Sequence, residues 1–402
     1  MSVATRGPSD SGQAGGWALG VCMGVSNILG YIFVLIVSRA LGPADFGAFT
    51  AVNNTAMLIS LPASAFQVVV AAHQARGHEH RSGIGLAWLV GGALSVVTLV
   101  ISPVIAEVFH LDSPAAMVLV ATLIPAQMLT GAAQGLLLGH RRFSALASVY
   151  VLIALARVLA AVVAILLDSG VVGVFGWLVV ATWLPAVAAL AMARVHVQRW
   201  RRLELGLVRQ LLTSNGALAV LLAMTSTDVL FARHELTAHD AGAYAFAGLF
   251  GKVVFWGTQF VALTLVPTAS LVDHHRRPVM SALGLVVGLG TVAAAVVAVA
   301  GPWLVTLLGG AQYDSAVPML LPFVGLGTLW ALCQVLLFAD MARGHRTLTA
   351  AGLITTVIGG ASLWVVGPDS AAVIITVYAV SATVVVIIGS VRLLDPGTAT
   401  RH

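Results

Sequence analysis

The chain has 402 residues, of which 59% are hydrophobic and only 9% are charged, and its mean hydropathy is +1.00. This composition excludes a soluble globular protein of this size, because too few polar residues remain to face water. The formal net charge of +5 does not indicate a nucleic-acid partner, since the basic residues fall in short loops between apolar runs rather than on one soluble face.

Apolar runs of membrane length recur along the chain, so the predicted fold class is an all-α polytopic membrane protein. We expect residues 1–15, which are polar and rich in small side chains, to be a disordered cytoplasmic N-terminus. Twelve transmembrane helices are predicted, at residues 17–38, 47–70, 84–108, 115–138, 146–167, 171–193, 211–231, 243–268, 279–300, 316–339, 348–366 and 371–390. Gly301–Gly310 fits an interfacial segment or part of a span, because Pro302 and Trp303 fall where a membrane surface is expected.

The basic residues orient these spans. Of the 20 Lys and Arg residues, all but four fall at the N-terminus, at the C-terminus or in alternate connections. The positive-inside bias places these connections, and both termini, in the cytoplasm. The exceptions are Arg39 and Arg233 in outer connections, and Arg157 and Lys252 within predicted spans.

The twelve predicted spans divide into two six-helix bundles. The N-terminal bundle covers residues 16–193 and the C-terminal bundle residues 211–391, with a cytoplasmic tail at 392–402. Residues 194–210 between them carry apolar side chains at helical spacing opposite several arginines, as an amphipathic helix at the membrane surface would. A solvated linker is an equally good interpretation of this stretch.

A repeated motif supports the division into halves. Asp45-Phe-Gly-Ala-Phe49 follows the first span of the first half, and Asp240-Ala-Gly-Ala-Tyr244 follows the first span of the second half. An arginine precedes each copy, Arg39 in one and Arg233 in the other. Equivalent elements lie six predicted spans apart, so both copies have the same orientation, as in parallel repeats related by an axis along the membrane normal.

Polar side chains at helical spacing on several spans predict a hydrated cavity between the halves. For each uncharged residue alone, packing between helices is the more common explanation. Arg157 and Lys252 carry more weight, because a charge at the membrane centre costs at least about 2.5–3.5 kcal/mol. The candidate cavity residues are Asn27, Arg39, Asn53, Asn54, Gln67, Gln127, Gln134, Arg157, Asp228, Lys252 and Gln259.

The two membrane-embedded cations suggest a binding site for an anionic head group, most simply a phosphate or pyrophosphate. The alternative interpretation of each is snorkelling or a buried ion pair. The sequence contains no Walker A loop and no HExxH or CxxC pattern, so it predicts no ATPase, no metal site and no cofactor. It also contains no long outer loop that would house a catalytic domain, so we expect a transporter and not an enzyme.

The chain resembles the Wzx-type oligosaccharide flippases, a branch of the multidrug/oligosaccharidyl-lipid/polysaccharide (MOP) exporter superfamily. The resemblance rests on Ser38–Phe49 followed by Asn53 and Asn54, and on Leu307–Tyr313 followed by Ala316-Val-Pro-Met-Leu. It implies two six-helix bundles in a V and a multi-pass carrier in the bacterial inner membrane. The implied substrate is an undecaprenyl-pyrophosphate-linked oligosaccharide repeat unit, moved outward by alternating access for polysaccharide biosynthesis.

The resemblance further implies membrane lipids and polysaccharide assembly proteins as partners, and cationic residues in the cavity. Arg157 and Lys252 are the candidates within the membrane, and Arg39 is the candidate at the outer rim. A lipid II-type flippase or a small-molecule antiporter of the same fold remains an alternative. An antiporter of organic cations should have carboxylates at mid-membrane depth, and the membrane interior offers only Asp228, near an edge. Coupling to a proton or a sodium gradient stays open.

Overall fold

The computed structural model describes residues 10–75, 82–195, 211, 216–258 and 276–394. Within these ranges the regular elements are helices, with no strand. The predicted linker at 194–210 and the tail at 392–402 lie largely outside the described residues. Helix α1 (Asp10–Ile59) already begins at Asp10, so residues 10–15, for which the sequence predicts disorder, are helical.

The described helices fall into two compact units. The first unit comprises Met1–Ala40, Ile59–Glu107 and Asp112–Asn215, and the second comprises Leu41–Leu58, Val108–Leu111 and Gly216–His402. Two outer segments of the first half of the sequence, Leu41–Leu58 and Val108–Leu111, therefore group with the second half. The bundle boundaries expected from the sequence follow the order of the chain and do not anticipate this exchange.

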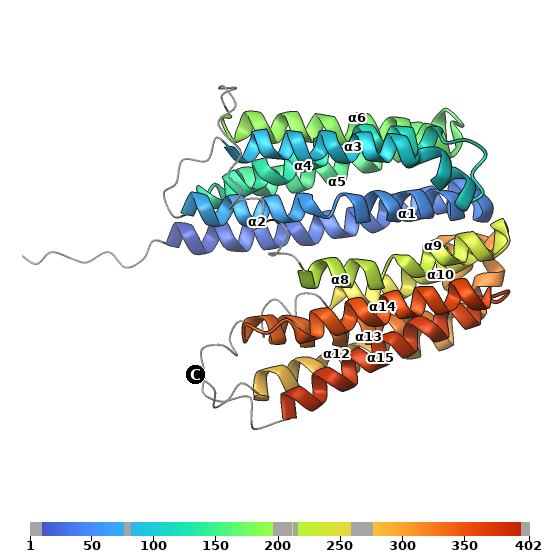
Figure 1. The fold of residues 1–402 in the computed structure, drawn as a ribbon. Helices are drawn as coiled ribbons and strands as arrows, with labels where there is room; N and C mark the ends of the chain where they lie inside the picture. Colours follow the sequence, from blue (N-terminus) through green and yellow to red (C-terminus); the bar gives the residue numbers. More distant parts are fainter. Residues whose placement is uncertain (1–9, 76–81, 196–210, 212–215, 259–275, 395–402) are drawn as a thin grey trace, which may run out of the picture. The chain divides into compact units, whose positions relative to one another are not determined.

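The first unit packs the start of α1 with α2 (Pro62–Ala75), α3 (Ser82–Val108), α4 (Ala115–Gly139), α5 (Phe143–Leu166) and α6 (Gly170–Met192). Figure 1 shows α3, α4, α5 and α6 as long helices that lie side by side. Helix α4 is the most buried of them and contacts both α2 and α6.

Glycines on α4 let α2 approach closely. A Cβ atom built on Gly131 would lie 2.1 Å from the carbonyl oxygen of Ala63, and one on Gly135 would lie 2.8 Å from that of Gln67. Small residues at such helix–helix contacts permit close backbone packing in membranes. The glycine spacing of α4 therefore explains which face of this helix packs against α2.

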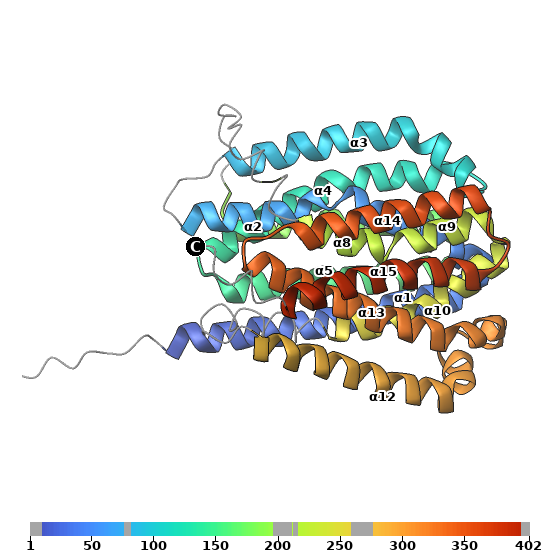
Figure 2. The ribbon, with the colours of Figure 1, turned by 60° about the horizontal axis from the view of Figure 1, so that its bottom comes forward.

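The second unit contains α8 (Gly216–Met224), α9 (Thr227–Glu235), α10 (Ala238–Gly257), α12 (Arg276–Leu308), α13 (Val317–Ala342), α14 (Thr347–Val366) and α15 (Ala371–Leu394), with a short 3₁₀ helix, η1 (Ala311–Ala316), before α13. Figure 2 shows α12 beside α13, and α14 and α15 also pack together. Helix α12 continues through Pro302 to Leu308, so most of Gly301–Gly310 belongs to a long helix and not to a separate interfacial segment.

The helix breaks follow local chemistry. Gly42 has a left-handed φ of 73° and divides α1 into two helices, and Pro43 begins the second of them. Glycine after the last helical residue and proline at the first position of the next helix are the usual residues for such a junction. The predicted break at Ser38–Phe49 is thus present, and its cause is the Gly-Pro pair.

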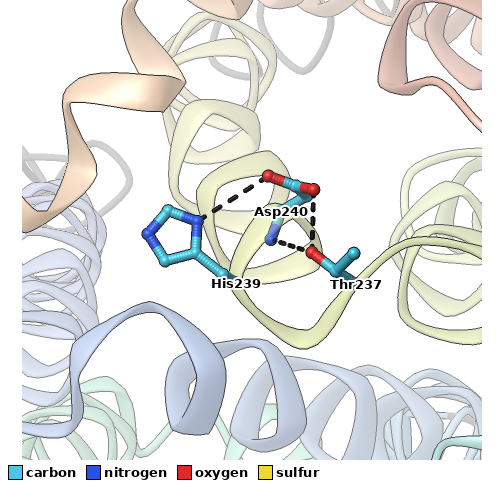
Figure 3. Close-up of polar contacts among 3 residues, drawn as sticks. All are labelled: Thr237, His239 and Asp240. Atoms are coloured by element: carbon cyan, nitrogen blue, oxygen red, sulfur yellow. Dashed lines mark hydrogen bonds and ion pairs between the residues drawn. The ribbon is translucent and has the colours of Figure 1, made fainter.

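The second copy of the motif breaks its helix by a different device. Thr237 precedes α10, and the backbone N–H of Asp240 donates to its hydroxyl oxygen at 3.2 Å. The same hydroxyl donates to the carboxylate of Asp240 at 2.7 Å, and His239 lies 3.7 Å from the other carboxylate oxygen. Figure 3 shows the carboxylate of Asp240 between Thr237 and His239. Thr237 is therefore the N-cap of α10, and its hydroxyl also fixes the position of the Asp240 carboxylate.

Ten helical segments within the described residues are long and apolar enough to cross a membrane. One of them, Leu19–Ala75, has 57 residues and contains the junction at Gly42, and α10 is not among the ten. These two places account for the difference from the twelve predicted spans. The span count and the cytoplasmic location of the termini stay predictions.

The two copies of the repeated motif contact each other within the second unit. A Cβ atom built on Gly242 would lie 1.7 Å from the carbonyl oxygen of Pro43, and one on Gly47 would lie 3.0 Å from the backbone nitrogen of Gly242. Gly47 and Gly242 occupy equivalent positions in the two copies. The repeated glycine is therefore the point at which equivalent helices of the two halves meet.

Candidate substrate-binding residues

Lys252, on α10, donates a hydrogen bond at 3.3 Å to the side-chain oxygen of Asn54, which lies 198 residues earlier in the chain. The amide of Asn54 is itself oriented, because its nitrogen donates at 2.7 Å to the carbonyl oxygen of Thr50 one helical turn away. Asn54 is buried, and Lys252 is half-buried. Two of the predicted cavity residues are thus in direct contact, and one of them fixes the position of the other.

Asp228 joins the same group from a broken helix. It lies in the first turn of α9, directly after the break that separates α8 from α9 at Thr225–Ser226, and its side chain is fully buried. One carboxylate oxygen accepts a hydrogen bond from the hydroxyl of Tyr244 at 3.3 Å. The other oxygen has no hydrogen-bond partner among the described residues.

Burial opposes a negative charge at Asp228, and two other features favour one. The first turn of a helix presents partial positive charge to a carboxylate. The ammonium group of Lys252, which donates to Asn54, also acts on Asp228 electrostatically. A neighbouring hydrogen bond, from Tyr378 to Thr227 at 2.8 Å, extends the polar group onto α15.

Arg157 has different surroundings in the first unit. Its guanidinium carbon lies 5.3 Å from the centre of the Phe33 ring, a cation–π contact between α5 and the start of α1. The structure places no hydrogen bond or ion pair on Arg157 among the described residues. The described acids of this unit, Asp10, Glu107, Asp112 and Asp168, lie at helix ends or in turns rather than in the interior of a span.

A second polar contact of the first unit joins α2 to α5. The side-chain nitrogen of Gln67 donates to the hydroxyl oxygen of Tyr150 at 2.7 Å. Tyr150 lies on α5 seven residues before Arg157, which is two turns of a helix, so both side chains project from similar faces of α5. An amide, a phenol and a guanidinium therefore occur together in this unit, the combination that binds hydroxyl and phosphate groups.

The remaining predicted residues vary in their surroundings. The side chains of Asn27 and Arg39 are exposed, those of Asn53 and Gln127 are half-buried, and that of Gln134 is buried on α4. Gln259 lies outside the described residues. Of the predicted residues, Asn54 and Lys252 are thus joined by a hydrogen bond, and Asp228 acts on Lys252 electrostatically. The cavity predicted between the halves stays a prediction.

The structure also contains polar residues that the sequence interpretation passed over. Arg233, predicted to occupy an outer connection, is buried, whereas Arg39, its counterpart in the repeat and the predicted rim residue, is exposed. Gln334 corresponds to Gln134 in a second repeat, because each glutamine precedes a leucine-rich stretch and then a Gly-His-Arg sequence. Gln334 is buried on α13, and neither of its polar side-chain atoms has a hydrogen-bond partner among the described residues. The repeat itself was the signal that could have drawn attention to both.

No group of three or more His, Cys, Asp or Glu side chains within the described residues could hold a metal ion. The polar residues instead supply cations, amides and phenols, which bind anions and hydroxyl groups.

The fold is that of known membrane transporters. An inward-facing multidrug resistance MATE family transporter of the MOP superfamily matches with a TM-score of 0.74 and 14% identity, over 93% of this chain and 96% of that chain. The lipid II flippase MurJ in an inward closed conformation matches with a TM-score of 0.73 and 8% identity, over 95% and 88%. A MOP superfamily transporter from Pyrococcus furiosus matches with a TM-score of 0.66 and 13% identity, over 100% of both chains.

The long apolar helices and these structural matches define a multi-pass membrane protein with the fold of the MOP superfamily transporters. In sequence, the model of the polysaccharide biosynthesis protein family matches residues 14–270. The chain therefore belongs to the polysaccharide biosynthesis protein family. A search of curated proteins gives no match to this sequence.

Proposed function

We propose that this protein is a flippase that moves undecaprenyl-pyrophosphate-linked oligosaccharide repeat units outward across the bacterial inner membrane by alternating access. It serves polysaccharide biosynthesis and carries out no covalent chemistry. The observation that carries this proposal is one cation within the helices of each unit, Arg157 on α5 and Lys252 on α10, in a chain of the polysaccharide biosynthesis family.

The energetics support an anionic head group as the cargo. A cation in a membrane span is costly unless it has a partner of opposite charge. Lys252 has Asp228 nearby, whereas Arg157 has an aromatic ring and no acid among the described residues that contact it. A phosphate or pyrophosphate group supplies the missing negative charge. The polyprenyl tail stays in the lipid while the charged, hydroxyl-rich head crosses between the polar faces.

The two cations suit different parts of this task. The planar guanidinium of Arg157 presents five N–H donors, and a cation that stacks on a ring keeps its edge available for bidentate binding of phosphate oxygens. Lys252 is a point charge held by Asn54 and near Asp228, so it can exchange one negative partner for another. We assign the principal phosphate contact to Arg157 and an exchange of partners to Lys252.

The same proposal includes the residue through which an ion gradient would drive transport. A proton or sodium gradient would act through a carboxylate that changes its partner during transport. Asp228 is the candidate, because it is buried at a helix break, next to Lys252, with one oxygen that has no hydrogen bond among the described residues. Broken helices near the midplane are where transporters of several folds place their substrates and coupling ions.

The test uses Arg157→Ala, Lys252→Ala and the double variant in cells that depend on this protein for surface glycan. We expect each single change to lower glycan export at least about tenfold, because loss of a charge-assisted hydrogen bond costs about 1.5–3 kcal/mol. Arg157→Lys should retain part of the export, since the charge remains without the planar fork.

Arg277→Ala is the matched control, because this exposed arginine lies at the start of α12 and not on the helices that carry the two cations. Immunoblotting of membrane fractions confirms equal protein levels. Normal glycan export by the double variant would remove the proposal. Efflux of organic cations that depends on Asp228, without any effect on glycan, would replace it with an antiporter.

A further inference from the structure

Arg233, in the last turn of α9, is buried and contacts three main-chain carbonyl groups. Its Nε donates to Phe109 at 2.9 Å, its Nη1 to Ala44 at 3.3 Å, and its Nη2 to His110 at 3.1 Å. All three acceptors come from the first half of the sequence, more than 120 residues away. One side chain of the second half thus holds two separate outer connections of the first half.

The three carbonyl groups that accept from Arg233 lie where the main chain can spare an acceptor. Phe109 and His110 form the turn after α3, so their carbonyl groups lie outside the hydrogen-bond ladder of the helix and accept from Arg233 instead. Ala44 lies directly after the Gly42–Pro43 junction. Because the guanidinium is a rigid fork, it fixes the two connections relative to each other as well as to α9.

His234, the next residue, strengthens the same contact. Its Nδ1 lies 2.8 Å from the carbonyl oxygen of Val108, a distance at which a protonated Nδ1 donates a hydrogen bond. Its ring stacks on that of His110, with centroids 5.8 Å apart, and on that of Trp364, with centroids 5.1 Å apart. The chain from Val108 to His110 is therefore held at successive main-chain groups and by ring stacking.

The contacts just described explain why Val108–Leu111 groups with the second unit. The close approach of Gly242 to Pro43, the residue before Ala44, and the hydrogen bond from Lys252 to Asn54 also hold Leu41–Leu58 to the same unit. Arg233 and His234 act at the end of the helices that the basic residues place outside, and Lys252 acts in the second half of α10.

We infer that Arg233 and His234 form an outer latch, which keeps the outer connections of the first half bound to α9 and must open once in each transport cycle. The inference rests on the proposed function only for the statement that a cycle exists, since a carrier with alternating access must expose its site to both sides. The latch itself rests on the contacts. Opening replaces three carbonyl acceptors of Arg233 with water, which can hydrogen-bond to every group released.

The first experiment measures access to Asn53, which lies on the second helix of α1 between the latch and Asn54. A chain with Cys22→Ser, Cys333→Ser and Asn53→Cys is labelled on intact cells with a maleimide that does not cross the membrane. We expect Arg233→Ala to raise the labelling rate several-fold and Arg233→Lys to raise it less. His239→Ala, an exposed change near the start of α10, is the matched control and should leave the rate unchanged. An unchanged rate in Arg233→Ala would overturn the latch.

The second experiment guards against a variant that has simply lost its fold. His110→Cys and His234→Cys are added to the same chain and joined with a short cleavable thiol cross-linker before labelling. We expect the cross-link to lower the labelling of Asn53→Cys to background, and cleavage to restore it. Labelling that continues unchanged in the cross-linked protein would show that the site opens outward without release of these connections. Neither readout involves glycan, so failure of the proposed substrate would leave the latch standing.

Discussion

Asp340 is a buried acid near the end of α13 that makes two separate interactions, a hydrogen bond and an ion pair. One carboxylate oxygen accepts a hydrogen bond at 3.0 Å from the backbone N–H of Leu348, in the first turn of α14. The other lies 3.7 Å from Arg392 of α15, in an ion pair whose acid is 1% exposed and whose arginine is 23% exposed. A single side chain thus joins three helices, caps a helix start and compensates an arginine.

We therefore expect Asp340→Ala to reduce the free energy of unfolding by an amount on the order of 3–5 kcal/mol, because it leaves the arginine charge without its partner. The thermal midpoint of the purified protein should fall accordingly. Asp340→Asn should cost less, since the amide oxygen still accepts from Leu348. A thermal shift measurement in detergent compares the two variants, with Thr349→Ser, one residue beyond the contact, as the control. Equal losses for Asn and Ala would show that the hydrogen bond to Leu348 contributes little.

The two cations within the membrane, Arg157 and Lys252, differ in their interaction partners. Lys252 has a fixed amide partner and a carboxylate that acts on it, whereas Arg157 has a ring. The sequence presents both simply as charges near the middle of a span. Their different partners lead us to expect a larger effect of Arg157→Ala than of Lys252→Ala on export.

Among the elements, α10 has the closest backbone contacts. Gly242 approaches Pro43, and a Cβ on Gly251 would lie 2.4 Å from the carbonyl oxygen of Phe323 on α13. In contrast, a Cβ on Gly248 would meet the Phe323 ring at 3.5 Å, an ordinary contact. Gly242 and Gly251 are nine residues apart and therefore lie on opposite faces of the helix, so each face has one position that tolerates no side chain. The glycine between them, Gly248, is less constrained.

Gly242→Ala should consequently destabilise the protein and reduce its level in membranes. The new methyl group would overlap main-chain atoms that have no rotamer to change, and overpacking of this kind typically costs about 1–3 kcal/mol or more. Gly248→Ala is the matched control on the same helix, where the higher helix propensity of alanine should make the change neutral or favourable. The comparison uses the thermal midpoint and the yield of monodisperse protein. A Gly242→Ala protein as stable as Gly248→Ala would contradict the close contact.

At the scale of the whole molecule, orientation in the membrane depends on the distribution of charge. The basic connections alternate with connections that are nearly free of Lys and Arg, and the structure assigns Arg277 to the start of α12. We expect a cysteine at Arg76 or at Arg277 to be unreactive toward an impermeant thiol reagent on intact cells and to react after permeabilisation. A cysteine at His239 should react in intact cells, because His239 lies at the start of α10, the end that the charge distribution places outside. The reverse pattern would overturn the predicted orientation and place the latch on the cytoplasmic side.

The sequence by itself determined the class of protein, the approximate spans, the junction at Gly42 and the repeat that contains Gly47 and Gly242. These features depend on hydropathy and on local backbone chemistry, and both can be read from neighbouring residues. It also located Arg157, Asp228 and Lys252 within spans, because a charge stands out against an apolar background.

The tertiary structure alone decided the partners of these charges. It paired Lys252 with Asn54 across 198 residues, stacked Arg157 on Phe33, and buried Arg233 rather than Arg39 against the outer connections. It also split the predicted spans at 47–70 and 211–231 into pairs of helices, α1 with α2 and α8 with α9. The physical reason is that contacts between distant segments depend on which helix faces meet, and a glycine- and alanine-rich membrane sequence permits many faces to meet equally well.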